Sequence, residues 1–130
     1  MIAQGHIEAD LQRAIKAVRA AESLLDNGFP EDAVSRAYYA VLHAARAALM
    51  VEGLAARTHT GVRRRFGTDL VQSGSIEGEW AKVLARAQSA RETADYDTAT
   101  AMDEERAADL VDQARRFVAR MAEFRDDKGL

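Results

Sequence analysis

The stretch from Ser35 to Met50, SRAYYAVLHAARAALM, constrains the fold more than any other part of the chain. Alanine has the highest helix propensity, and the stretch contains no glycine or proline, so it predicts one uninterrupted helix. Its apolar residues recur every three or four positions on one broad stripe, which is typical of a helix that faces a core. They are Tyr38, Val41, Leu42, Ala45, Ala48 and Leu49. The small alanine side chains also favour close approach by another helix.

The same spacing of apolar residues appears towards both ends of the chain. Residues 5–27 are predicted to form a first helix, which ends at Gly28, and Pro30 suits the first turn of the next helix. This second helix should end at Gly53, and the short connection predicts an antiparallel hairpin. The two apolar seams consist of Ile7, Leu11, Ala14, Val18, Ala21 and Leu25, and of Leu110, Ala114, Phe117, Met121 and Phe124.

The middle of the chain breaks this pattern. Residues 54–61 are predicted to be a loop, residues 62–72 a short helix, and residues 76–95 a third long helix. A fourth long helix should begin near Thr100, whose hydroxyl would cap it, with Asp103 as the reciprocal partner. The expected fold is all-α: an up-and-down bundle of four long helices plus one short helix. One domain would span residues 1–130, with a core at about 5–124 and a short polar C-terminal tail.

Composition excludes several classes of function. The chain has no cysteine, which excludes disulfides and thiol catalysis, and a net charge of −3, so nucleic-acid binding would need a local basic patch. No apolar run is long enough to span a membrane, which predicts a cytoplasmic protein. No metal-binding loop or nucleotide-hydrolysis motif occurs, and the acidic run from Glu92 to Asp109 is typical of a solvated face, so we expect no metal and no cofactor.

The second helix carries the first candidate site. Arg36 and His43 are seven residues apart and therefore share a face, with Tyr39 between them. Such a polar line is consistent with a site for RNA or a nucleotide. Taken alone, the line favours the alternative, a histidine and a tyrosine that are satisfied within the bundle and an arginine in solvent.

The segment from residue 57 to residue 65 carries the second candidate site. Four arginines and His59 occur there without an acidic residue, and guanidinium groups bind phosphate in a bidentate manner. The alternative is a solvated basic surface. The arginines are Arg57, Arg63, Arg64 and Arg65.

The end of the third long helix carries the third candidate site. Arg91 and Asp95 are four residues apart and are expected to form an ion pair, which by itself is a common surface feature. Tyr96 adds a hydroxyl and a stacking surface.

Three motifs in this order, YYAVLHAA, THTG and RETADY, resemble those of small stand-alone prokaryotic HEPN-domain proteins. The resemblance covers roughly residues 5–120. It implies a helical bundle that forms a homodimer and binds RNA or a nucleotide in the cleft between protomers. It also implies a toxin–antitoxin role, with a minimal nucleotidyltransferase as antitoxin, and it makes Tyr96 the candidate for modification by AMP.

The resemblance leaves catalysis open. Active members of the superfamily have an arginine, four to six residues and then a histidine where this chain has Arg91, and no histidine follows Arg91. Either the protein is a metal-independent ribonuclease that uses Arg91, Asp95 and His59, or it is a non-catalytic module that binds a nucleotide or a partner protein. A bundle that serves only as an interaction surface is the third alternative.

Overall fold

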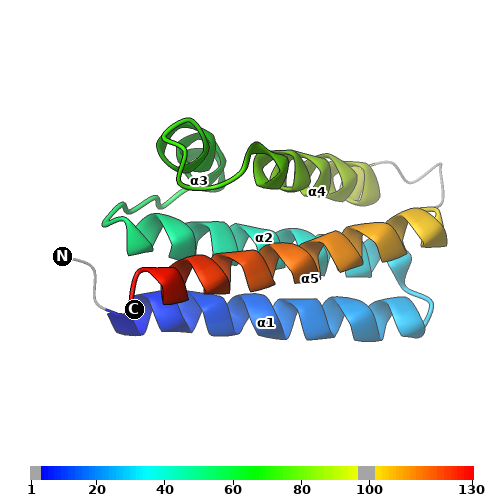
Figure 1. The fold of residues 1–130 in the computed structure, drawn as a ribbon. Coiled ribbons are helices and arrows are strands. Elements are labelled where there is room, and N and C mark those ends of the chain that lie inside the picture. The colour runs from blue at the N-terminus through cyan, green and yellow to red at the C-terminus, as the bar shows by residue number, and fades with distance from the viewer. Residues whose placement is uncertain (1–3, 97–101) are drawn as a thin grey trace.

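A computed structural model describes residues 4–96 and 102–130, and every regular element in these residues is a helix (Figure 1). The expected all-α bundle is therefore confirmed. The elements are α1 (Gln4–Asp26), α2 (Pro30–Val51), α3 (His59–Arg65), the π-helical segment η1 (Phe66–Val71), α4 (Gly78–Tyr96) and α5 (Glu104–Asp127).

Helix α2 lies at the centre of the bundle and contacts every other element. Helices α1 and α5 run alongside it, and α3 and α4 lie on the side of α2 away from α1 (Figure 1). Its alanines are at most 1% exposed, because they pack against these helices of the same chain. The alanine stripe, expected to favour close helix approach, is therefore used within the protomer and is not available to a second copy.

The predicted apolar seams form the core. Every residue of the two seams is buried except Leu25, which is half-buried. Helix α2 begins at Pro30, with Glu31 and Asp32 in its first turn, where they favour the positive end of the helix dipole. Gly28 has a φ of 85°, which lets the chain turn sharply from α1 into α2.

Two predicted helix starts are wrong. Helix α3 begins at His59 rather than at residue 62, because Thr58 is its N-cap: its Oγ1 accepts a hydrogen bond from the Gly61 amide at 2.9 Å. Helix α5 is capped by Asp103 itself, whose Oδ1 accepts from the Glu105 amide at 3.0 Å. Thr100, the predicted cap, lies outside the described residues.

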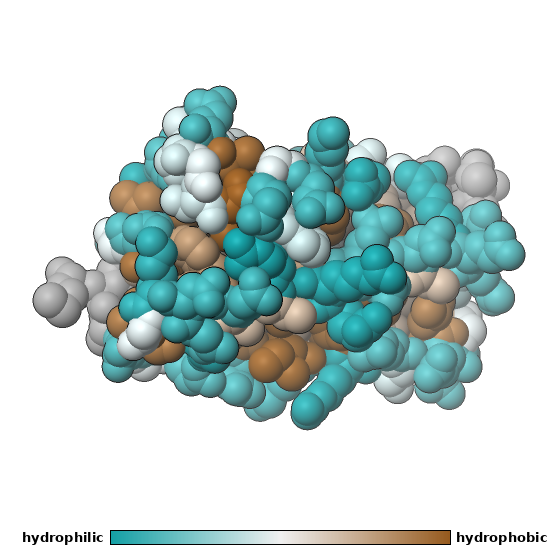
Figure 2. Space-filling view, viewed as in Figure 1, coloured by the Kyte–Doolittle hydropathy of each residue, from teal (hydrophilic) through white to brown (hydrophobic). Residues whose placement is uncertain are grey.

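The C-terminal end and the outer surface complete the description. Helix α5 continues to Asp127, so the first residues of the expected polar tail are helical, and Arg125 forms an ion pair with Glu8 of α1. Figure 2 shows a mostly hydrophilic face with separate apolar patches. In the described part of the chain, no helix is both long enough and apolar enough to cross a membrane.

Candidate nucleic-acid interface

Side chains from three helices meet where α3 and α4 face α2. The guanidinium carbon of Arg91 lies 5.3 Å from the ring centroid of Tyr38 and 5.8 Å from that of Tyr39, within cation–π range of both. The ring of His59 meets each tyrosine edge-on, with 6.1 Å between centroids. We call Tyr38, Tyr39, His59, Arg63 and Arg91 the arginine–tyrosine cluster.

Arg63 holds the buried end of this cluster. Its Nη1 donates a hydrogen bond of 2.7 Å to the hydroxyl of Tyr38, a residue that is completely buried. Its Nη2 donates to the Thr60 hydroxyl at 3.3 Å. The hydroxyl of Tyr38 thus has a partner inside the bundle, as a buried polar group requires, and α3 is tied to α2.

Asp95 positions Arg91 from the next turn of α4. Its Oδ2 lies 3.2 Å from Nε of Arg91, and its Oδ1 accepts a hydrogen bond from the Ser35 hydroxyl of α2 at 3.2 Å. The predicted ion pair is therefore present. The Nε atom of Arg91 is buried and has no hydrogen-bond partner among the described residues, so this contact is an ion pair without a hydrogen bond.

His59 is the exposed titratable group of the cluster. Desolvation of its ring and the positive charges of Arg91 and Arg63 lower the pKa of His59 below its ordinary value. The lowered pKa favours the neutral imidazole, which can accept a proton. Solvent exposure leaves it accessible to a ligand.

A second polar constellation lies on the α1 side of α2. Asp10 is 5% exposed, and it accepts two hydrogen bonds of 2.7 Å, from Nε and Nη2 of Arg46. Nδ1 of His43 lies 3.3 Å from Oδ1 of the same carboxylate. Burial acts to raise the pKa of Asp10, but the hydrogen bonds from Arg46 and His43 outweigh it and lower the pKa to about 2. Asp10 therefore remains charged and fixes both side chains.

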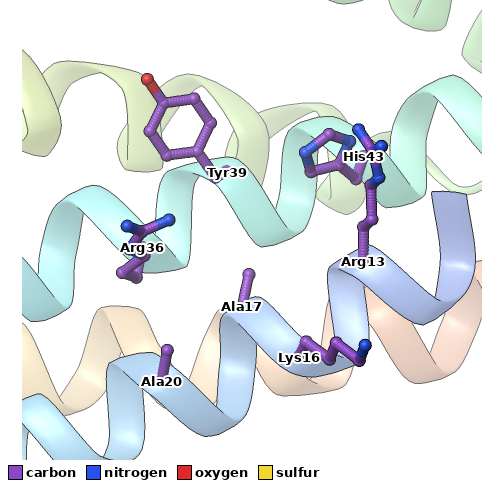
Figure 3. Close-up of a pocket in the computed structure, with 7 residues that line it drawn as sticks. All are labelled: Arg13, Lys16, Ala17, Ala20, Arg36, Tyr39 and His43. Carbon is purple, nitrogen blue, oxygen red and sulfur yellow. The ribbon is translucent and has the colours of Figure 1, made fainter.

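A basic pocket of about 450 Å³ opens beside these residues, between α1 and α2 (Figure 3). Tyr39 also belongs to the arginine–tyrosine cluster, so its ring connects the two sides of α2. The pocket is lined by Arg13, Lys16, Ala17, Ala20, Arg36, Tyr39 and His43.

Comparison with known proteins identifies the fold. A family model described as the HEPN domain matches residues 7–124. The chain belongs to the HEPN domain family. Two similar proteins come from archaea. The first, named "Putative toxin MJ0605", from Methanocaldococcus jannaschii, is 36% identical over 115 residues, covering 88% of this chain and 85% of that protein. The second, "UPF0332 protein PH1297" from Pyrococcus horikoshii, is 41% identical over 83 residues, covering 64% and 58%.

This HEPN domain brings several of the predicted site residues together. His59 and Arg91, far apart in the sequence, both contact the tyrosines of α2, and Asp95 pairs with Arg91. Arg36 and His43 line one pocket with Tyr39, as their shared helix face predicts. No histidine follows Arg91 in this chain, and the histidine next to the same tyrosines comes from α3 instead.

The predicted basic segment from residue 57 to residue 65 is divided by the fold. Arg63 points to Tyr38, whereas Arg65 pairs with Asp69 at 3.0 Å. Arg57 lines a second pocket, together with Asp10, Arg13 and Arg46. Arg64 is exposed, as is Tyr96, at 78%. These arginines therefore face different surfaces of the HEPN domain.

Sequence reasoning missed the α1 half of the basic pocket. Neither Arg13 and Lys16 of α1 nor the pair of Asp10 and Arg46 belongs to a motif that the sequence analysis singles out. A signal was present, because residues 36, 39, 43 and 46 of α2 share one face by their three-four spacing. Among residues 4–96 and 102–130, no group of three histidine or acidic side chains is arranged to hold a metal ion.

Proposed function

We propose that this HEPN protein is of the toxin type and binds RNA or a nucleotide at the arginine–tyrosine cluster. The observation that carries the proposal is the placement of Arg91 over the rings of Tyr38 and Tyr39, beside the exposed His59. A guanidinium held in this way can bind phosphate, and the half-exposed ring of Tyr39 can stack on a base. The name "Putative toxin" of two relatives supports the toxin role.

Two forms of this function follow from the same geometry. In a metal-independent ribonuclease, His59 would accept the proton of the 2′-hydroxyl as the 2′-oxygen bonds to phosphorus and the bond from phosphorus to the 5′-oxygen breaks. The protonated His59, directly or through water, would return that proton to the leaving 5′-oxygen, while Arg91 stabilises the negative charge on the phosphoryl oxygens. In a non-catalytic module, the same residues would only bind the ligand. The absence of a histidine after Arg91 favours the second form. In both forms Asp95 orients Arg91, because its two oxygens already face Arg91 and Ser35.

The proposed partner is a minimal nucleotidyltransferase antitoxin. Tyr96 follows directly after Asp95 and is 78% exposed, which leaves its hydroxyl accessible to an enzyme that transfers AMP. We expect intact mass spectrometry after co-expression with a neighbouring nucleotidyltransferase to show added AMP in the parent and not in Tyr96→Phe. An adduct that survives this substitution, or no adduct in the parent, contradicts the assignment.

A homodimer is part of the proposal. Because the alanines of α2 are buried within the protomer, the candidate surface is the apolar groove between α1 and α5. It is lined by Ile15, Val18, Ala119 and Ala122, with Arg19, Glu22 and Arg115 supplying charges of both signs that a second copy can complement. A sedimentation mass near that of the 14.2 kDa monomer at all concentrations would contradict it.

The test of the binding proposal uses RNA in the presence of EDTA. The parent, Arg91→Ala and the control Arg86→Ala, an exposed arginine of the same helix, are incubated with labelled RNA and with AMP. We expect Arg91→Ala to weaken binding by about tenfold, or to abolish cleavage where the parent cleaves, and Arg86→Ala to behave as the parent does. Parent protein that binds neither ligand contradicts the proposed function, as does equal binding by Arg91→Ala.

A further inference from the structure

Helices α1 and α2 each present one stripe of residues to the groove between them. The α2 stripe has three-four spacing throughout, and the α1 stripe runs in the opposite direction because the two helices are antiparallel (Figure 1). The α2 stripe consists of Arg36, Tyr39, His43, Arg46 and Met50. The α1 stripe consists of His6, Ala9, Asp10, Arg13, Lys16, Ala17 and Ala20. We call the space between these stripes the α1–α2 groove.

The groove is longer than either of the two pockets within it. The pocket that Arg36 lines has a volume of about 450 Å³, and the pocket that Arg57 lines has a volume of about 400 Å³. Arg13 lines both, so the two pockets adjoin. Between residues 36 and 50, α2 rises by about 21 Å, which gives the approximate length of the groove.

Cations without a partner line this groove from end to end. Arg13, Lys16, Arg36 and Arg57 are exposed, and none of them forms an ion pair with the described residues. Because the whole chain has a net charge of −3, this concentration of positive charge is local. A local cationic groove attracts a polyanion.

The one carboxylate that lines the described groove does not oppose an anionic ligand. Asp10 is buried, and its two oxygens already accept hydrogen bonds from Arg46. Its charge is therefore compensated within the fold. The contact with His43 also fixes the imidazole ring in the groove wall.

The shape of the groove favours a single strand. Tyr39 offers a half-buried ring on which an unpaired base can stack, whereas the bases of a duplex are stacked inside it. Ala17 and Ala20 have small side chains, so that an RNA backbone can approach α1 closely (Figure 3). A length of about 21 Å corresponds to about six stacked nucleotides at 3.4 Å each, well beyond one mononucleotide.

We propose that the α1–α2 groove binds the sugar–phosphate backbone of single-stranded RNA, with its phosphates on Arg13, Lys16, Arg36 and Arg57. This inference rests on the proposed function and selects a polynucleotide over a free nucleotide as the ligand. Because Tyr39 belongs to both regions, a strand in the groove that stacks on Tyr39 brings its next phosphate towards Arg91 and His59.

The test measures the salt dependence of RNA binding by fluorescence anisotropy. The probes are a labelled eight-nucleotide RNA, the same RNA as a duplex, an acidic peptide of equal charge, and AMP. The variants are Arg13→Gln/Lys16→Gln, the matched control Lys82→Gln/Arg86→Gln on α4, and Arg91→Ala. Glutamine is a good helix former, and all four substituted cations of the two double variants are exposed, so the fold should persist, as circular dichroism can verify.

We expect the groove variant to bind the single strand at least about tenfold more weakly at low salt than the parent does. Its slope of log affinity against log salt should be shallower by about 1.4, because each lost phosphate contact changes the slope by about 0.7 for a single strand. The control should match the parent. The duplex and the peptide should bind more weakly than the single strand.

The contradicting results separate the two proposals. If the groove variant has the affinity and the salt slope of the parent, the groove does not bind RNA. If Arg91→Ala still weakens binding in that case, the proposal for the arginine–tyrosine cluster is retained. Binding of AMP but not of the eight-nucleotide RNA also overturns the groove alone. Tighter binding of the duplex or the peptide identifies another class of ligand and overturns the groove. Failure of the parent to bind either RNA or AMP overturns the proposed function itself.

Discussion

The two sides of α2 hold their cations differently. On the α3–α4 side, Arg63 donates to the Tyr38 hydroxyl, and Arg91 lies over two tyrosine rings beside Asp95. On the α1 side, Arg13 and Arg36 extend into solvent without an ion pair among the described residues, and Arg46 alone is fixed by a carboxylate.

This difference indicates two contributions to binding. A guanidinium that the fold already holds loses little conformational freedom when a ligand arrives, so it favours one geometry of the bound phosphate. Free cations attract phosphate through counterion release, which gives affinity that falls steeply with salt. Arg91→Ala on the α3–α4 side should therefore weaken binding at every salt concentration and make the salt slope shallower by only about 0.7, whereas the groove double variant should make it shallower by about 1.4.

The largest expected effect is a loss of stability when Arg46, the arginine that Asp10 holds on the α1 side of α2, is replaced. Arg46→Ala leaves the buried carboxylate of Asp10 with His43 as its remaining partner, and should lower the free energy of unfolding by roughly 2–4 kcal/mol. Arg46 is itself about one-third exposed, which keeps the expected loss below that of a fully buried pair. Urea denaturation measures it, with Arg13→Ala, an exposed neighbour, as a control within about 0.5 kcal/mol of the parent. Equal free energies of unfolding for Arg46→Ala and the control would show that the contact between Asp10 and Arg46 does not stabilise the fold.

The second prediction concerns acid. The pKa of Asp10 is lowered from 3.8 to about 2 in the folded protein, so its contribution is present above pH 4 and is lost as the pH falls towards 2. The contribution is roughly 2 kcal/mol. Glu77 of the exposed surface has a pKa lowered to about 2 by hydrogen bonds from Arg120 and Trp80, and titrates over an overlapping range.

Comparison of Asp10→Asn and Glu77→Gln separates the two carboxylates. The free energy of unfolding is measured in urea between pH 5 and pH 2. It should fall less steeply with falling pH in Asp10→Asn than in Glu77→Gln, because Glu77 is exposed and its ion pair is screened. The reverse order would mean that the surface pair dominates acid sensitivity.

The smallest stability effect tests the α3 side. A Cβ at Gly61 would lie 2.9 Å from the Thr58 hydroxyl oxygen that caps α3, so Gly61→Ala should cost about 1 kcal/mol and shift His59. A Cβ at Gly67 meets nothing within 4 Å, so Gly67→Ala should be neutral or should stabilise by about 0.5–1 kcal/mol. We expect weaker RNA binding in Gly61→Ala alone. Equal effects of both substitutions would show that the cap does not hold His59.

The core of the fold could be predicted from the sequence because its cause is periodic. Seams such as Ile7 to Ala21 repeat at three and four residues, and Gly28 and Pro30 mark the turn between α1 and α2. The first residue of a helix was harder to predict where two neighbouring residues could each serve as the N-cap. THTG contains two threonines, and the structure shows that Thr58 caps and Thr60 lies inside α3.

The candidate site was only half predictable because it depends on contacts between helices. Spacing places Arg36, Tyr39 and His43 on one face of α2, but it cannot show that Asp10 lies opposite Arg46, thirty-six residues away. Nor can it show that the alanine face of α2 is covered by the same chain. The approach of His59 to Arg91 likewise depends on how α3 and α4 pack against α2.

Ultraviolet crosslinking tests most directly whether one RNA strand contacts both sides of α2. An eight-nucleotide RNA that carries 4-thiouridine is bound and irradiated, and the crosslinked peptides are identified by mass spectrometry. Because Tyr39 is the residue common to the groove and the arginine–tyrosine cluster, we expect the strongest crosslink there, with weaker crosslinks at His59 and at Lys16 or Arg13. Crosslinks confined to the α1–α5 groove around Ile15 and Val118, with none on α2, would contradict the account.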